Sequence, residues 1–206
     1  MRALRPACCA LIVIWWGCHG HASAPPQAGH VHCRLSWSAD GLKWGWVDPG
    51  GLTGKEFVPA GTAGAFDSHI CFAAARPVEL ESEHRIYYMG GNGPHNGARN
   101  SSFGLATLGL DRFAGLAGTG TVLTRELLVT GKTLMITADV GAGGSVKVGA
   151  SDAAGLGPSD ATPIAAAATR AAVAFVGGKD FGGYIGKTLA FTIELSDATV
   201  YTVGFA

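Results

Sequence analysis

The first shortage in this sequence is charge. Only 15% of the 206 residues are charged, and 15 Lys and Arg residues balance 15 Asp and Glu residues, so the formal net charge is zero. Partners such as nucleic acids and anionic membranes select proteins with an excess of positive charge. The sequence gives no basis for either partner. Because 48% of the residues are hydrophobic, the chain also has enough apolar material for a folded core.

The sequence also lacks an apolar run long enough for a comfortable membrane span, which needs about 20 residues. The apolar run in residues 7–17 is shorter, follows two arginines and precedes Ala-Ser-Ala at 22–24. A positive start, a short apolar core and a small-x-small site are typical of a secretory signal peptide. We predict that residues 1–24 are such a signal and that the protein is secreted.

Two alternatives to a cleaved signal stay open. Pro25 occupies the first position after the predicted cleavage site, which is unfavourable for signal peptidase. An uncleaved N-terminal anchor, or an artefact of the gene model, would also account for the segment.

Cysteine is scarce in the predicted mature protein. Three of the five cysteines lie within residues 1–24, which leaves Cys33 and Cys71. In an oxidising compartment this pair is a disulfide candidate. Two buried free thiols on neighbouring strands are the alternative, because sequence alone does not place the residues close together.

Several chemical motifs are missing. The sequence contains no Gly-rich phosphate loop, no nucleophile elbow and no zinc-binding helix motif. His30 and His32 lie on one side of an extended segment, but no suitably spaced Cys or His follows to complete a metal site. We therefore expect neither a metal site nor a cofactor.

Short strands dominate the first half of the predicted mature chain. Residues 66–116 alternate β-branched, aromatic and apolar segments with turns rich in Gly, Asn and Pro. Four short antiparallel strands of this kind are the pattern of one β-propeller blade. The four segments are 66–75, 84–91, 101–108 and 111–116.

Longer strands with clear alternation follow residues 118–120. In residues 187–195, Leu189, Phe191, Ile193 and Leu195 share one face, so that face is predicted to be buried. Between the strands, the Ala-rich residues 153–170 read as a loop with a helical turn at 164–169. Six strands of this type indicate an antiparallel β-sandwich. They are 121–130, 132–140, 145–151, 171–178, 187–196 and 199–206, with turns predicted at 131–132, 141–144 and 197–198.

The sequence resembles the C-terminal half of the five-bladed propeller glycoside hydrolases of the family-32 and family-43 type. The likeness covers residues 33–206 and is carried by SADGLKW, FDSHICF, RIYYMGGNGPH and FGLATLGLDRFAGL, followed by the β-rich tail. SADGLKW, at 38–44, is similar to an Asp-box hairpin, which is structural. The resemblance implies an all-β fold, with a partial propeller in residues 25–117, its last blade at 66–116, and a β-sandwich in 118–206.

Asp67 and His69 are the first candidate ligand-binding residues. They share one face of a strand by period two, at the end that a propeller presents to its ligand funnel. Both side chains can bind sugar hydroxyls; alternatively, His69 can reach a cation on the propeller axis. The structural alternative is that Asp67 caps a turn and His69 is a histidine satisfied within the channel.

The second candidate site is the glycine-rich loop at residues 90–102. It carries His95, Asn96 and Arg99, whose side chains are of the type that recognises sugar hydroxyls or carboxylates. An ordinary loop with a solvated Arg99 is the alternative. Asn100 begins an Asn-Ser-Ser sequon and is therefore a glycosylation candidate.

Glycoside hydrolysis needs two carboxylates around the scissile bond. In the resembling families these acids belong to early blades, and no segment here matches their motifs. We therefore predict a secreted, carbohydrate-associated protein without catalytic residues, with possible self-association through open blade flanks. A truncated gene model of an active fructosidase-like or arabinanase-like enzyme, and a non-enzymatic extracellular structural or adhesion domain, are the alternatives.

Overall fold

A computed structural model describes residues 9–15, 29–38, 41–51 and 54–206. In this described part the structure is all-β, with 52% of the residues in strands and several antiparallel sheets, none of them closed. The predicted fold class is confirmed at this level. The predicted cleavage site at 22–24 and Asp40 of the predicted Asp-box hairpin lie outside the described residues. The described part contains no helix with the length and hydrophobicity that crossing a bilayer requires.

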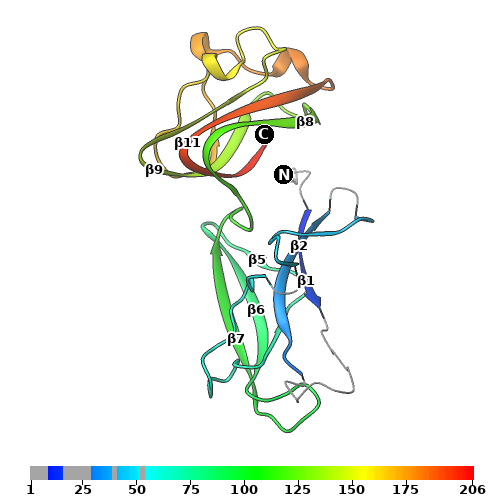
Figure 1. Cartoon of the computed structure of the whole chain (residues 1–206). Helices are drawn as coiled ribbons and strands as arrows, with labels where there is room; N and C mark the ends of the chain where they lie inside the picture. Colours follow the sequence, from blue (N-terminus) through cyan, green and yellow to red (C-terminus); the bar gives the residue numbers. More distant parts are fainter. Residues whose placement is uncertain (1–8, 16–28, 39–40, 52–53) are drawn as a thin grey trace. The chain divides into compact units, whose positions relative to one another are not determined.

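The chain divides into two compact units (Figure 1). The N-terminal unit comprises Ala7–Leu110, and the C-terminal unit comprises Asp111–Ala206. Each unit has its own cluster of buried apolar side chains.

The first sheet of the N-terminal unit contains β1 (Cys9–Trp15), β2 (His32–Ser38) and β3 (Gly45–Trp46), in that order. Strand β1 falls within the apolar core of the predicted signal peptide and pairs antiparallel with all of β2. Val31, directly before β2, forms a parallel bridge with Ile70 of the second sheet. This bridge connects the two sheets of the unit.

The second sheet is built around β6 (Glu83–Gly91). Strands β4 (Ile70–Ala73) and β5 (Val78–Glu79) pair with successive parts of one edge of β6, and β7 (Ser101–Gly109) pairs with the whole of the other edge. Side chains of β6 alternate, so that His84, Ile86 and Tyr88 are buried. This sheet positions the candidate ligand-binding residues.

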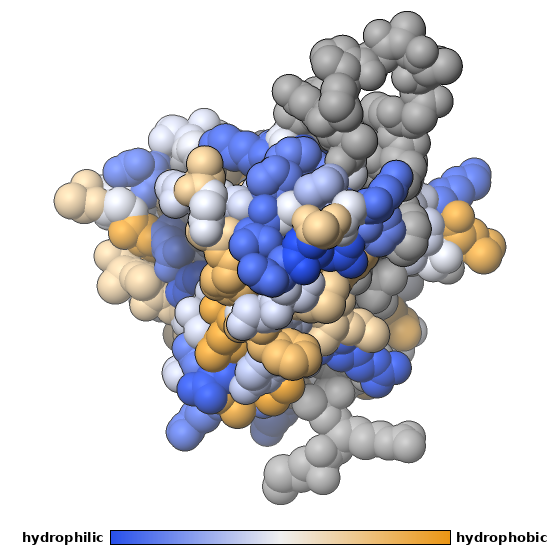
Figure 2. All heavy atoms as spheres, turned by 90° about the horizontal axis from the view of Figure 1, so that it is seen from below, coloured by the Kyte–Doolittle hydropathy of each residue, from blue (hydrophilic) through white to orange (hydrophobic). Residues whose placement is uncertain are grey.

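The second sheet exposes apolar side chains on its outer face. Tyr87 of β6 lies opposite Leu105 of β7, and Met89 lies opposite Phe103. Phe103 is 87% exposed, whereas Tyr87 and Leu105 are about half exposed. A space-filling view shows apolar residues gathered in surface patches among polar ones (Figure 2). Both faces of this sheet are therefore apolar, although only the inner face is covered.

Residues 111–116 do not form the fourth strand predicted for this sheet. Arg170 instead forms a two-pronged ion pair with Asp111 (2.7 and 2.8 Å), and Arg112 binds Asp139 at 2.8 Å. Leu116 then begins a strand of the C-terminal sheet. These charge-assisted bonds hold the segment within the C-terminal unit. The apolar pattern of residues 111–116 gives no sign of these distant ion pairs.

The C-terminal unit contains a four-stranded antiparallel sheet in the order β10-β9-β11-β8. The long strands β9 and β11 lie side by side, with β8 on the far edge of β11 (Figure 1). Short 3₁₀ turns lie in the connections. The bounds are β8 (Leu116–Leu128), β9 (Leu134–Gly149), β10 (Ala168–Ala172), β11 (Thr188–Phe205), η2 (Pro158–Asp160), η3 (Val176–Gly178) and η4 (Gly182–Tyr184).

Two of the predicted turns are bulges inside continuous strands. Pairing of β9 with β11 shifts register between Ser196 and Ala198, where Asp197 has φ +42° and faces residues 141–144. Gly141 approaches the Asp197 side chain so closely that a Cβ there would collide with it. Glycine and an Asp with positive φ suit a bulge as well as a turn. The predicted strands 132–140 and 145–151 are therefore the single strand β9, and 187–196 and 199–206 are the single strand β11.

The buried face of β11 follows the predicted alternation. Phe191, Ile193 and Leu195 are buried, whereas Glu194 is exposed. Phe181, which follows η3, is fully buried beside Phe191. The sheet and its connecting loops therefore enclose one aromatic-rich core.

The helical turn predicted at residues 164–169 is absent. Ile164 exchanges backbone hydrogen bonds with Val146 of β9 (2.9 Å each way), and Ala168 begins β10. Pairing with a strand edge satisfies backbone groups that a short Ala-rich turn would leave to solvent, and alanine alone is a weak determinant of helix.

Candidate functional site

The candidate ligand-binding residues lie near one end of the second sheet of the N-terminal unit. His69 immediately precedes β4, and its backbone N–H donates to the carbonyl of Gly91 at the end of β6 (3.0 Å). Residues 92–100 connect that end of β6 to β7. Antiparallel pairing thus brings His69 and the loop that carries His95, Asn96 and Arg99 to one edge of the fold.

Asp67 is buried and already bonded. It is 8% exposed, and its Oδ2 accepts a hydrogen bond from the Tyr88 hydroxyl at 2.7 Å. Burial, together with this bond, raises the pKa of Tyr88 to about 12. Phe66 stacks on the Tyr88 ring at a centroid distance of 6.1 Å. The carboxylate therefore has a clear structural task, linking the segment before β4 to the middle of β6.

His69 takes part in a stack of three imidazoles that we call the histidine stack: His30, His32 and His69. The rings of His69 and His30 are 4.5 Å apart, and those of His30 and His32 are 5.7 Å apart. The His69 Nδ1 is 2.9 Å from the Ser68 hydroxyl, and the His32 Nδ1 is 2.5 Å from a Glu56 carboxylate oxygen. Burial, followed by the charges of His69 and His32, lowers the pKa of His30.

The histidine stack joins the first candidate site to the second. The backbone carbonyl of Gly29, next to His30, accepts a hydrogen bond from the backbone N–H of His95 (2.8 Å). Gly29 has φ +101°, and a Cβ at this position would overlap the His95 backbone. Glycine is therefore required where the N-terminal segment meets the loop.

Within the loop, Arg99 holds the backbone in shape. Its Nη1 donates to the carbonyls of His95 (2.6 Å) and Pro94 (3.3 Å). Its Nε is buried and has no hydrogen-bond partner among the described residues. The His95 ring meets Phe72 edge-on at 5.7 Å, whereas Asn96 is exposed. Asn96 is thus the loop side chain presented most openly to a ligand.

The glycosylation candidate Asn100 is also exposed, and its backbone N–H donates to the Asn92 side chain at 2.9 Å. Its position directly before β7 places the sequon at the start of an edge strand.

Sequence reasoning did not find three partners of this site: Tyr88, Glu56 and the stacking role of His30. The His-x-His alternation was the one available signal for the stack, because it puts His30 and His32 on one side. Their contact with His69 depends on a bridge between residues 31 and 70 that no local pattern encodes. Among the described residues, no group of three His, Cys, Asp or Glu side chains has an arrangement that would hold a metal ion.

Cys33 and Cys71 are free thiols in direct contact. Both are buried in the core of the N-terminal unit, and the backbone N–H of Cys71 donates to the carbonyl of Val31, two residues before Cys33 (2.9 Å). The Cys71 thiol donates a hydrogen bond to the Cys33 sulfur, which lowers the pKa of Cys33. That bond, together with burial, raises the pKa of Cys71.

We expect this pair to form a disulfide when the reduced, unfolded chain is refolded with oxidised glutathione. The two thiols lose two protons and two electrons, and one glutathione disulfide is reduced to two thiols. Closing a loop between cysteines 38 residues apart is worth about 3–4 kcal/mol. Thiol titration in denaturant should find two fewer reactive thiols than in the reduced protein. A Cys71→Ser variant serves as the control, and equal thiol counts in the wild type refolded with oxidised glutathione and in the reduced wild type would contradict the expectation.

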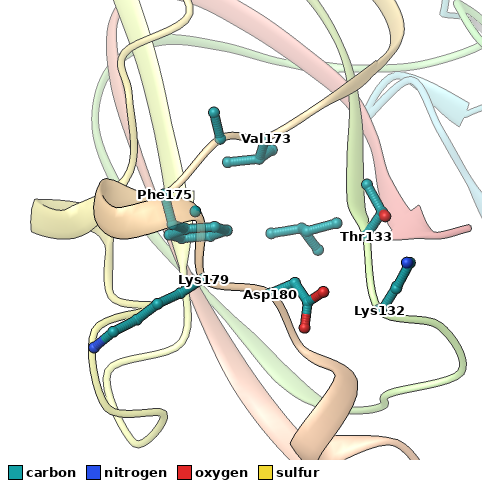
Figure 3. A pocket seen from close by; sticks show the side chains of 9 residues that line it. Lys132, Thr133, Val173, Phe175, Lys179 and Asp180 are labelled. Carbon is teal, nitrogen blue, oxygen red and sulfur yellow. The ribbon is translucent and has the colours of Figure 1, made fainter.

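A small cavity in the C-terminal unit was not anticipated from the sequence. Its volume is about 230 Å³, with Leu134, Val173 and Phe175 among its lining residues. Figure 3 shows Thr133 and Lys132 together at one side, whereas the Lys179 chain extends away from the cavity. Pockets for drug-sized ligands usually enclose about 300–1,000 Å³, so this cavity suits at most a very small molecule.

Comparisons with known proteins give no assignment. No protein-family model matches the sequence, and neither the curated proteins nor the solved structures contain a match.

Proposed function

We propose that this chain is a secreted, carbohydrate-associated protein that binds glycan without hydrolysing it. In this proposal the N-terminal unit corresponds to the last part of a β-propeller, and the C-terminal unit corresponds to the β-sandwich of the resembling glycoside hydrolases. The second sheet, with apolar residues on both faces, supports the propeller part, since blades pack against neighbours on both sides.

One observation carries the binding part of the proposal: His69 and the loop with Asn96 and Arg99 are held near one sheet end by the backbone bonds of His69 and His95 and by the side-chain bond of Arg99. Imidazole, amide and guanidinium groups are suitable partners for sugar hydroxyls. The loop around them is fixed by Gly29 and by Arg99, so a ligand would meet a largely preformed surface.

Two carboxylates near this sheet end are already engaged, which supports binding without hydrolysis. The Asp67 oxygen is used by Tyr88, and Glu56 is used by His32. A glycosidase needs one carboxylic acid and one ionised carboxylate facing the same glycosidic oxygen and anomeric carbon. Neither of these two carboxylates is free to take such a role in this arrangement.

The test is glycan binding by the full chain, measured on a glycan array and then by calorimetry with β-fructan and arabinan oligosaccharides. Asn96→Ala is expected to weaken binding about tenfold, the effect of losing one or two hydrogen bonds. The melting temperature should stay unchanged, because Asn96 is exposed. Ser82→Ala, in the exposed turn before β6, is the matched control and should bind like the wild type.

Two results would overturn this proposal. Release of reducing sugar by the wild-type chain would show catalysis, and an array without signal above background would leave a structural or adhesion domain as the better assignment.

A further inference from the structure

Strand β7 has an open edge. It pairs with β6 along its whole length, from Gly109 opposite Glu83 to Ser101 opposite Gly91. No other strand among the described residues pairs with β7. A nine-residue strand therefore presents a row of unpaired backbone N–H and C=O groups, which is a template for another strand.

The β7 edge lacks charge and proline, two of the usual devices against strand pairing. Its sequence, SSFGLATLG, contains no charged residue and no proline. The edge strand β8 of the C-terminal unit is different, since it contains Arg125 and Glu126. It also has Gly118 and Gly120 at positive φ, where the strand departs from regular extended geometry. Charges and irregular backbone are features that keep edge strands from associating.

The side chains beside the open edge are apolar. Phe103 is 87% exposed and Leu105 is 48% exposed on the outer face, next to the half-exposed Tyr87 of β6. The charged residues of β6 on this face, Glu83 and Arg85, neutralise each other at 2.7 Å. An incoming strand would thus cover hydrophobic surface without burying an unpaired charge from this part of the sheet.

We propose that β7 is the pairing edge for a second copy of this chain, with the two β7 strands antiparallel across a two-fold axis near Leu105. Leu105 is the midpoint of β7 (Ser101–Gly109), so the strand is aligned with itself along its full length by such an axis. The uncharged strand places no like charges opposite each other, and the whole chain has no net charge to oppose association.

Pairing of this kind joins the two second sheets into one continuous sheet. Leu105 of each copy lies next to its counterpart, and each Phe103 lies near Thr107 of the other copy. This dimer is separate from the proposed glycan binding, because it forms at the β7 edge and not at the sheet end that carries His69 and Asn96.

The experiment is sedimentation equilibrium of the full chain over a wide concentration range. Enzymatically deglycosylated protein is used, because the Asn100 sequon lies directly before β7. The wild type is expected to form a concentration-dependent dimer. Leu105→Lys places two ammonium groups at the axis and should weaken the dimer at least tenfold. Leu123 lies on the charged edge strand β8 and is 70% exposed. Leu123→Lys is therefore the control and should leave the dimer unchanged.

A cross-linking experiment keeps the test independent of any folding defect in the lysine variant. Leu105→Cys should form an intermolecular disulfide across the axis on mild oxidation, since directly opposed residues of antiparallel strands have Cα separations that a disulfide can span. Leu123→Cys should not. A wild type that stays monomeric at all concentrations, a dimer that tolerates both Leu105→Lys and Phe103→Lys, or equal cross-linking by the two cysteine variants would each overturn the proposal.

Discussion

Replacing Phe181 with alanine is expected to lower the free energy of unfolding of the C-terminal unit by about 3–5 kcal/mol, the usual cost of truncating a buried aromatic side chain. The Phe181 ring is fully buried and lies 5.5–6.3 Å from four other aromatic rings. The effect is expected to be large because removal of the ring leaves a cavity among these aromatic side chains. The four neighbouring rings belong to Phe175, Tyr184, Phe191 and Phe205.

The measurement is denaturant unfolding followed by circular dichroism and, separately, by tryptophan fluorescence. All five tryptophans lie between Trp15 and Trp46, so fluorescence reports the N-terminal unit. The Phe181→Ala variant should move the circular dichroism transition and leave the fluorescence transition in place. Val176→Ala, at a side chain that is 71% exposed, is the control. A loss below about 1 kcal/mol would contradict the assigned core position of Phe181.

Asp67→Ala is expected to destabilise the N-terminal unit by about 2–3 kcal/mol. The substitution removes a hydrogen bond between a buried carboxylate and the Tyr88 hydroxyl, and it leaves that hydroxyl buried without its partner. Tryptophan fluorescence should therefore show an earlier transition. Unchanged stability combined with lost glycan binding would instead assign Asp67 to the ligand, which is the alternative that the sequence leaves open.

The matched variants for this bond are Asp67→Asn and Tyr88→Phe. Asparagine keeps an oxygen acceptor for the hydroxyl, so its cost should be smaller than that of alanine. A double-mutant cycle between Asp67→Ala and Tyr88→Phe should give a coupling energy of about 1 kcal/mol or more. Additive effects would contradict the contact.

The same bond predicts a dependence on alkaline pH. Because the folded-state pKa of Tyr88 is raised to about 12, above the value of about 10 in an unfolded chain, folding favours the neutral phenol. This contribution is fully present below pH 10 and is lost as pH rises from 10 through 12. Tyr88→Phe should remove that part of the pH dependence of the fluorescence transition.

The elements that could be predicted from the sequence were those with local signals. Period-two alternation correctly placed Phe191, Ile193 and Leu195 on the buried face of β11, because neighbouring positions in a strand point to opposite sides. The same local chemistry misled at Asp197, because a residue with positive φ beside glycines fits both a hairpin turn and a bulge. Only the pairing partner decides between them, and that partner is distant in the sequence.

The candidate site shows the same limit. The sequence predicts His69 and the loop with His95 as two separate candidate sites. Each prediction depends only on the position of the residues next to a predicted strand. Their connection through Gly29 and His30 requires a parallel bridge between β4 and the segment before β2, which neither composition nor spacing indicates. The bond between Asp67 and Tyr88 was missed for the same reason, since 21 residues separate the two partners.

The central place of β11 has a consequence for how fast the protein refolds. Strands β8 and β9 do not pair with each other; both pair with β11, and the partners of β8 and β11 are 60 to 84 residues apart. In the N-terminal unit, Trp37 of β2 and Trp46 of β3 belong to a strand pair whose partners are only 8 to 10 residues apart. Closing long loops before any contact is rewarded slows folding. After dilution from denaturant, the tryptophan signal should therefore recover first, and the C-terminal sheet should assemble in a later kinetic phase.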